Sequence, residues 1–196
     1  MKSGATLKVT KDFTKDFNDI VSKFKNDAVL VGIPEADNER KNEEESQDIG
    51  NAAILAINHF GSEKAGIPPR PVLTIGIRNA QEEIAEQFKK AAVNALTQGV
   101  SALDTYYERA GTIAANACKK VITDQEEIKA PSENTIAIRR AGGFHKWVES
   151  GADLGSFNYS TSKIKSVGGF AGHKALLVTG QLRNAIIYVV KGFGFK

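Results

Sequence analysis

Two long apolar repeats with the period of an α-helix, separated by Gly99, occupy the middle of this 196-residue chain. In each repeat, apolar residues recur every three or four positions, which places them on one helical face. The first repeat comprises Ile84, Phe88, Ala91, Ala92, Ala95 and Leu96, and the second comprises Leu103, Tyr106, Tyr107, Ala110, Ile113, Ala114, Ala117 and Val121. The pattern, which tolerates Gly111, predicts either a helical hairpin or one long helix kinked near Gly99. The alanine-rich faces indicate close packing against another element or another subunit.

Four short segments around these repeats have the composition of β-strands. The first alternates apolar and polar residues, and the other three are short apolar runs. They are residues 5–10, 28–33, 72–77 and 186–190. Residues 13–24 and 48–60 have helical spacing instead. We therefore expect an α+β fold in which a small, mostly antiparallel sheet packs against two long helices.

Two irregular stretches interrupt this pattern. Residues 35–48 contain almost no apolar side chains and are expected to form a mobile acidic loop. Residues 144–172 are rich in glycine and serine with scattered aromatic residues, which is typical of a long loop excursion. At 41% hydrophobic residues, the chain has enough apolar surface for one compact domain, so we expect residues 1–196 to form a single domain. No apolar stretch has the length of a signal peptide core or a membrane span, which favours a soluble protein that is not exported by a cleaved signal.

The formal net charge of +3 is unevenly distributed along the sequence. Residues 129–196 contain ten lysines and arginines against three carboxylates, a net charge of +7, which leaves −4 for residues 1–128. Such a division fits either a basic face for nucleic acid or complementary patches through which copies of one chain associate. Spread over this length of chain, it is more often a solvated surface. A nucleic-acid-binding module is therefore the alternative function.

Residue patterns that would indicate an enzyme are missing from the sequence. Residues 168–174 resemble a phosphate-binding loop, but His173 separates Gly172 from Lys174 and no Gly-Lys-Ser/Thr occurs. Cys118 lies in an alanine-rich helical pattern, which favours an inert packing role, and His59 lies near a helix end without other histidines nearby in sequence. We therefore expect no catalytic residue, no metal, no cofactor and no small-molecule substrate.

The first informative motif joins a helix end to a proline-rich turn. Phe60 and Gly61 close the apolar repeat of residues 48–60, and Gly61 occupies the position of a helix C-cap. Three prolines then fix an extended approach to residues 72–77, because proline restricts both its own backbone and that of the preceding residue. These prolines are Pro68, Pro69 and Pro71. Arg70 among them either solubilises the turn or pairs as a fork with a carboxylate that fixes the turn or a subunit contact.

The second motif lies shortly before the C-terminus. Thr179 and Gly180 precede a short helical segment whose first turn contains Gln181, Leu182 and Arg183. Threonine is a favourable N-cap residue, so this motif is expected to start a short helix that leads into the last strand.

In their order, these motifs resemble the virion-morphogenesis and tail-completion proteins of tailed bacteriophages, the Mu-type family and related tail-component proteins. Those proteins have a helix ending in Phe-Gly, then Ile-Pro-x-Arg-Pro, then a capped Thr-Ile/Leu-Ala-x-Arg helix, and finally Pro-Leu-x-x-Thr-Gly-x-Leu-Arg before a terminal strand. The corresponding segments here are residues 56–61, 67–73, 132–140 and 176–186. The chain departs from the pattern at Ala175, where the family usually has proline, and at Val178, where it often has aspartate.

The resemblance implies a structural virion protein that completes the tail or forms the neck joining head and tail, acting as a ring of identical subunits. It implies further copies of the chain and other neck or tail proteins as partners, with contact to genomic DNA in the conduit as an additional possibility. The implied location is the virion, after synthesis in the host cytoplasm. Within residues 144–172, Trp147, Phe157 and Tyr159 are candidate interface anchors that order on meeting neighbours.

Overall fold

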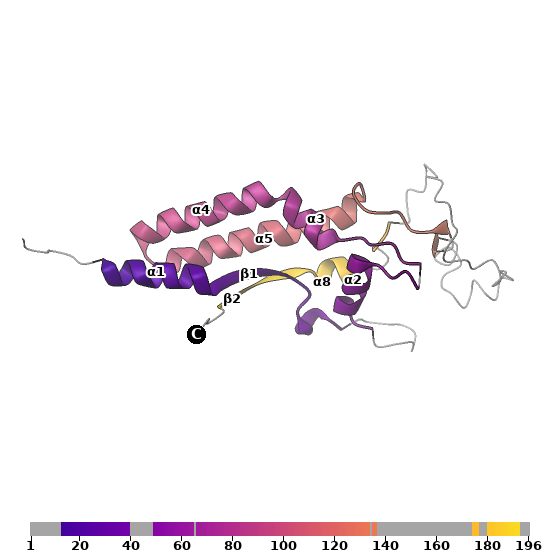
Figure 1. Ribbon diagram of the computed structural model, residues 1–196, viewed down its shortest axis with the longest axis horizontal. Coiled ribbons are helices and arrows are strands. Elements are labelled where there is room, and N and C mark those ends of the chain that lie inside the picture. Colours follow the sequence, from indigo (N-terminus) through magenta and orange to yellow (C-terminus); the bar gives the residue numbers. More distant parts are fainter. Residues whose placement is uncertain are drawn as a thin grey trace, which may run out of the picture.

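A computed structural model describes residues 13–39, 49–64, 66–133, 135–136, 174–176 and 180–192 of the chain (Figure 1). In chain order, the elements are α1 (Thr14–Asn26), β1 (Asp27–Gly32), the 3-10 helix η1 (Glu35–Asp37), α2 (Asn51–Phe60), α3 (Val72–Asn79), α4 (Gln81–Gln98), α5 (Ser101–Asp124), α8 (Gln181–Ala185) and β2 (Ile187–Gly192). The two strands form an antiparallel ribbon on which helices pack, so the expected α+β class is confirmed.

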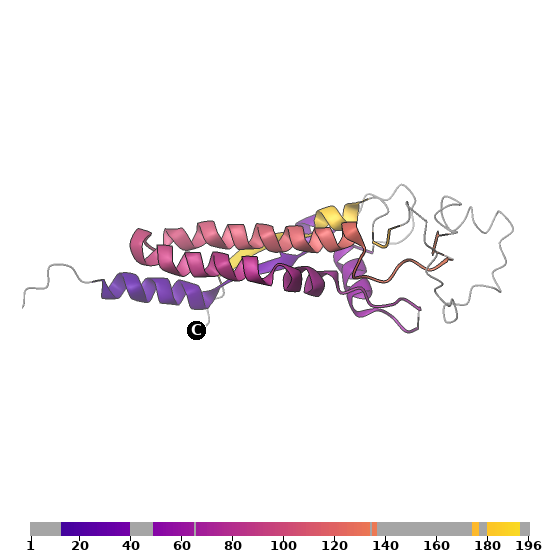
Figure 2. The same cartoon turned by 90° about the horizontal axis from the view of Figure 1, so that it is seen from above.

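Helices α4 and α5 form an antiparallel hairpin that runs along the long axis of the molecule (Figure 2). The turn between them contains Gly99, whose φ of 88° lies in a region that disfavours side chains. Ala91 and Ala95 of α4 are buried together with Leu103 and Tyr107 of α5. The apolar repeats thus form a hairpin rather than one kinked helix, and alanine allows the two helices to approach closely. At 24 residues, α5 is about 36 Å long.

The β1–β2 ribbon lies along α5 (Figure 1). Val31 of β1 pairs with Tyr188 of β2, and Tyr188 lies directly over Gly111 of α5. A Cβ atom at Gly111 would come within 2.3 Å of the Tyr188 ring. Gly111 is therefore required for the strand to approach the helix, and it is more than a tolerated residue in the helical repeat. On the opposite face of the ribbon, the paired residues Leu30 and Val189 are 45% and 41% exposed.

The prediction of a strand at residues 72–77 is wrong, because this segment forms α3. Val72, Ile75 and Gly76 are buried, at the spacing of three and four residues that defines one helical face. A Cβ atom at Gly76 would lie 2.6 Å from the Cα atom of Cys118, so α3 packs closely against α5. The packing of this face outweighs the β-propensity of a segment rich in β-branched residues.

The other expected elements agree with the structure where it describes them. Residues 13–24, 28–33, 48–60 and 186–190 correspond to α1, β1, α2 and β2. Residues 5–10, residues 137–140 of the short helix expected at residues 135–140, and the excursion with Trp147, Phe157 and Tyr159 lie outside the described residues. Ser132 accepts a hydrogen bond from the Thr135 backbone N–H at 3.2 Å, as expected of an N-cap residue.

The first residues of the expected mobile acidic loop form regular structure and are hydrogen-bonded to α2. Glu35–Asp37 form η1, and the Asn38 side-chain oxygen accepts a hydrogen bond from the Ala52 backbone N–H at 2.8 Å. Asn51 is buried and its side-chain amide donates to the carbonyl oxygens of Asp37 and Glu39. These bonds fix the start of α2, while residues 40–48 lie outside the described residues.

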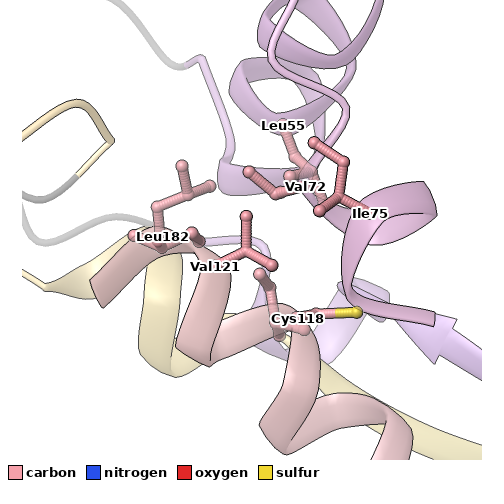
Figure 3. Packing of buried hydrophobic residues seen from close by; sticks show 8 residues of the cluster. Leu55, Val72, Ile75, Cys118, Val121 and Leu182 are labelled. Atoms are coloured by element: carbon pink, nitrogen blue, oxygen red, sulfur yellow. The ribbon is translucent and has the colours of Figure 1, made fainter. Parts of the chain in front are cut away.

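Two buried apolar clusters pack against α5 at different positions along its length. The first joins α1, α4 and α5, and the second joins α2, α3, α5 and α8 (Figure 3). The first consists of Ile20, Ala91, Ala95, Leu103 and Tyr107, and the second of Leu55, Val72, Ile75, Cys118, Val121, Ile122, Leu182 and Ile186. Within the described ranges, no helix combines the length and the apolar character needed to cross a membrane.

Candidate functional site

The two sequence motifs meet in space at the C-terminal end of α5. Helix α2, which carries the first motif, contacts α8, which carries the second. In Figure 3, the side chains of Leu182 and Val121 point toward those of Leu55 and Val72. More than a hundred residues separate Leu55 from Leu182 in the sequence. The structure thus brings both motifs into one packed junction.

Gly61 ends α2 in the manner expected of a C-cap. Its φ is 76°, and its N–H donates to the Ile57 carbonyl oxygen at 2.8 Å. A Cβ atom at Gly61 would lie 2.8 Å from the Ile67 carbonyl oxygen, so no side chain fits at this position. Ser62 and Ile67 then exchange two backbone hydrogen bonds, of 2.8 and 2.9 Å, which close the loop back on itself.

Arg70 is a buried residue of the proline-rich turn, with only 7% of its surface exposed. Its Nε donates to the Lys129 carbonyl oxygen at 2.7 Å and its Nη2 to the Ala130 carbonyl oxygen at 3.0 Å. Its Nη1 reaches the Asn58 side-chain oxygen at 3.4 Å, and its backbone N–H donates to the Asn58 carbonyl oxygen at 2.6 Å. A buried charge is tolerated only with such hydrogen bonds. Arg70 therefore works as a fork inside the fold, which excludes the interpretation as a solubilising surface residue. The fork bonds carbonyl and amide oxygens here, whereas the sequence had suggested a carboxylate as its partner.

The prolines around Arg70 differ in exposure. Pro69 is exposed, whereas Pro68 and Pro71 are half-buried. Pro71 immediately precedes α3, and its carbonyl oxygen accepts a hydrogen bond from the Ile75 N–H at 3.0 Å. Proline is well suited to this place because its missing N–H would have no partner within the helix.

Next to this turn lies an open apolar groove of about 290 Å³. Its walls come from the end of β1, the exposed side of α2 and the start of α3. They are Gly32, Ile33, Ala52, Leu55, Ala56, His59, Phe60 and Leu73. Phe60 is 80% exposed, and its ring contacts that of His59 edge-on with centroids 4.8 Å apart. The first motif thus supplies a buried clamp, Arg70, and an exposed aromatic residue, Phe60.

The second motif is anchored to α5. Gly180 has a φ of 76° and takes the N-cap position of α8, while Thr179, which was expected there, lies outside the described residues. Leu182 is 5% exposed, and the Arg183 Nε donates to the Thr123 hydroxyl oxygen at 3.0 Å. Gln181 is half-buried in the first turn of α8. The motif therefore fixes α8, and with it the start of β2, on the end of α5.

Sequence reasoning missed a further contact at this junction, between Gln125 and Ala175. Gln125 has a φ of 67° just after α5, and its side-chain oxygen accepts the Ala175 N–H at 2.7 Å. Its side-chain nitrogen donates to the Ala175 carbonyl oxygen at 3.0 Å. Proline has no N–H to donate, so the alanine at this position, where the resembled family usually has proline, makes the bond possible. A single glutamine after a helix carries no sequence signal for this pairing.

A second, polar cleft of about 470 Å³ lies between α5 and the start of α4. Two of the carboxylates that line it, those of Glu127 and Asp124, contact neighbouring cations or an amide. Arg78 pairs with Glu127 at 2.5 Å, Asn79 donates to the same carboxylate, and Lys120 lies 3.9 Å from Asp124. Among the described residues, no group of three or more His, Cys, Asp or Glu side chains is arranged to hold a metal ion.

Cys118 is fully buried behind α3, where its Sγ lies 3.6 Å from the Leu73 carbonyl oxygen. Burial raises the pKa of this thiol to about 11, so it stays protonated at neutral pH. Cys118 is therefore a packing residue. Among the described residues, the buried ionisable side chains are Arg70, Tyr107 and Cys118. The junction is built from apolar contacts and from hydrogen bonds that side chains such as Arg70 and Gln125 make to backbone groups. Comparison of the chain with protein-family models, with curated protein sequences and with solved structures finds no match in any of the three.

Proposed function

We propose that this protein is a structural virion component of a tailed bacteriophage. In this proposal it completes the tail or forms the neck that joins head and tail, and it acts in particle assembly as an oligomeric ring. The observation that carries the proposal is the order of the motifs along the chain, which resembles that of the Mu-type and related tail-component proteins. The residues that carry the resemblance, among them Gly61, Arg70 and Leu182, are also the ones that hold the junction together.

The surface of the described residues supports an assembly role. Large apolar side chains are exposed on several of the described elements. They include Phe13, Phe17, Leu30, Phe60, Val93, Leu96 and Val189. Such side chains are suited to contacts with other subunits, since aromatic and large aliphatic residues anchor protein interfaces.

The test is the morphology of particles made without the protein. A nonsense mutation in the gene should give separate heads and tails in the lysate, visible by negative-stain electron microscopy, and wild-type protein supplied from a plasmid should restore joined particles. Supplied Phe60→Asp should fail to restore them, whereas Glu63→Ala, an exposed change in the turn after the same helix, should succeed. Complete infectious particles in the absence of the protein would overturn the proposal.

The alternative function is nucleic-acid binding through the basic C-terminal third. The observation that favours it is the net charge of +7 over residues 129–196. Contacts between such a region and phosphates release counterions, so retention on immobilised DNA should fall steeply as salt is raised. The two functions are compatible, because a ring around a genome conduit can itself touch DNA. Retention that does not depend on salt would remove this alternative.

A further inference from the structure

The outer edge of β1 is open to another strand. Within the described residues the sheet has two strands, so each of them is paired on one side only. In such a ribbon, every second residue of a strand turns its backbone N–H and C=O groups away from the partner strand. Apart from the pairing with β2 and the bond from the Asp27 N–H to the Lys23 carbonyl oxygen, no described backbone group bonds to β1. Such a row of donors and acceptors is a template for one further strand.

The residues of β1 do nothing to prevent this pairing. Charged side chains, prolines and bulges are the features with which edge strands usually resist the approach of another strand. Residues 28–32 contain no charge and no proline, and their register with β2 continues without a bulge. In contrast, β2 carries Lys191, which is exposed. The edge suited to further pairing is therefore that of β1.

The side chains of β1 are incompletely covered on both faces of the ribbon. Val29 and Val31 pack against the apolar clusters on α5, yet both remain half-buried. Leu30, on the other face, is 45% exposed. Directly opposed residues of neighbouring strands lie about 4.5–5.5 Å apart at Cβ, so a strand added at this edge would cover residues on both faces.

We propose that the β1 edges of two copies of this chain pair antiparallel about a twofold axis at Leu30, which joins the two ribbons into one four-stranded sheet. In this register Leu30 lies opposite Leu30 of the second copy, Val29 opposite Val31, and Ala28 opposite Gly32. Residues that face α5 thus meet residues that face α5, as a continuous sheet requires. The contact closes on itself and gives a dimer. It concerns the free protein and does not rest on the function proposed above.

The charges at the two ends of the paired strands agree with this register. Next to the strands, the last turn of α1 in one copy lies beside the segment that leads from β1 into η1 in the other. Exposed Lys25 then comes within side-chain reach of exposed Glu35 of the second copy, and the symmetry repeats this pair. Of the other charges here, Lys23 and Asp27 lie 3.8 Å apart within one copy, and Asp37 adds a second negative charge to η1. Opposite charges at the rim of an interface favour encounter and fix its register.

The helices on the shared face fit the same arrangement. In each copy, α5 lies along both strands of its ribbon (Figure 1). The centres of two joined ribbons are two strand spacings apart, which is about 10 Å. Packed helices have axes about 8–10 Å apart, so two α5 helices can lie side by side beneath the sheet.

The first test is a disulfide that only this twofold axis allows. Leu30→Cys places two thiols opposite each other with Cα atoms about 4.5–5.5 Å apart, so mild oxidation should convert most of the protein into a covalent dimer. The matched control is Val189→Cys, at the similarly exposed cross-strand partner of Leu30. Its thiols would be three strand spacings apart, about 14 Å, so it should stay free of cross-links. Cys118 is fully buried and does not compete.

The second test exchanges the charges at the rim and measures the dimer dissociation constant by sedimentation. Lys25→Glu should weaken the dimer about tenfold, because two ion pairs become two repulsive contacts. The double variant Lys25→Glu/Glu35→Lys should return to the wild-type value, since the same two charges have changed places. Circular dichroism shows whether each variant is folded.

Three results would overturn the proposal: a wild-type protein that stays monomeric, equal cross-linking of Leu30→Cys and Val189→Cys, and a charge-exchanged double variant as weak as Lys25→Glu. Equal cross-linking would indicate random collision, and an unrestored double variant would mean that the strands do not pair in this register. Each of these results leaves the proposed virion function standing, because that function is tested by the morphology of particles.

Discussion

At the scale of single residues, Arg70 shows how a residue of a short sequence motif can serve the fold. Its guanidinium group lies inside the protein and bonds two consecutive carbonyl oxygens, those of Lys129 and Ala130. These carbonyls follow the end of α5, where helix hydrogen bonding no longer satisfies the chain. A planar fork with several donors matches two adjacent acceptors in a way that a single ammonium group does not.

Arg70→Lys should therefore lower the free energy of unfolding by about 1–3 kcal/mol. One ammonium group cannot bond both carbonyls and Asn58 at the distances that the guanidinium spans, so at least one buried acceptor loses its partner. Urea unfolding followed by circular dichroism measures the change. The control is Arg78→Lys, since the Arg78 side chain is 60% exposed and its ion pair with Glu127 is solvated. Equal stability of Arg70→Lys and wild type would show that the fork contributes nothing.

The thiol of Cys118 gives a prediction about pH. Burial raises its pKa to about 11 in the folded protein, from a reference value of 9.0. The folded state thus holds this proton more tightly than the unfolded state, so the contribution to stability is complete below pH 9 and is lost as the pH rises from 9 toward 11.

Urea unfolding at a series of alkaline pH values tests this loss. Between pH 9 and 11, stability should fall more steeply in the wild type than in Cys118→Ala, which lacks the titrating group. Tyr107, whose pKa is raised to about 12 mainly by burial, titrates in both proteins, and its effect cancels in the difference. Parallel pH profiles would contradict the assignment of a buried protonated thiol.

At the scale of elements, periodicity identified most of the helices and strands, and it failed where two patterns competed. Residues 72–77 read as a strand because valine and isoleucine dominate them, yet Val72, Ile75 and Gly76 also fit one helical face. In the structure, the helical face wins because it packs on α5, where Gly76 lies against Cys118 with no room for a side chain. The sequence contains both residues but does not tell that they touch.

The candidate site was predictable to a similar degree. The local features, Gly61 as a C-cap and Ser132 as an N-cap, follow from the residue types alone. The long-range contacts do not, because the partners of Arg70 and Gln125 are carbonyl or N–H groups about fifty to sixty residues away. Every residue has such backbone groups, so nothing in the side-chain pattern marks which of them will be used.

Gly111 gives the prediction at this scale. Gly111→Ala should destabilise the protein by about 1–3 kcal/mol, because the new methyl group would overlap the Tyr188 ring and push β2 away from α5. Alanine would otherwise favour the helix by up to about 1 kcal/mol, so the sign of the change reports the close contact. Gly32→Ala in β1 is the control, since no atom lies within 4 Å of a Cβ placed there. A stabilised Gly111→Ala would mean that the ribbon can shift at no cost.

At the scale of the whole molecule, α5 connects both apolar clusters. Leu103 and Tyr107 near its start belong to the cluster with α1 and α4, whereas Cys118 and Ile122 near its end belong to the cluster with α2, α3 and α8. The β-ribbon follows the same helix between them. Both clusters depend on α5, so disruption of the packing in one cluster also weakens the helix on which the other cluster packs. We therefore expect the elongated fold to unfold as one unit.

Leu103→Ala and Ile122→Ala test this cooperativity from the two ends. Both residues are fully buried, and each truncation should cost about 2–5 kcal/mol. If α5 couples the clusters, each variant shows a single urea transition with an unchanged slope, and near-ultraviolet and far-ultraviolet circular dichroism give the same midpoint. Leu96→Ala, at a position that is 62% exposed, should stay close to the wild type. If Ile122→Ala instead melts one part of the signal while the rest keeps the wild-type midpoint, the two clusters are independent and α5 is a linker between them.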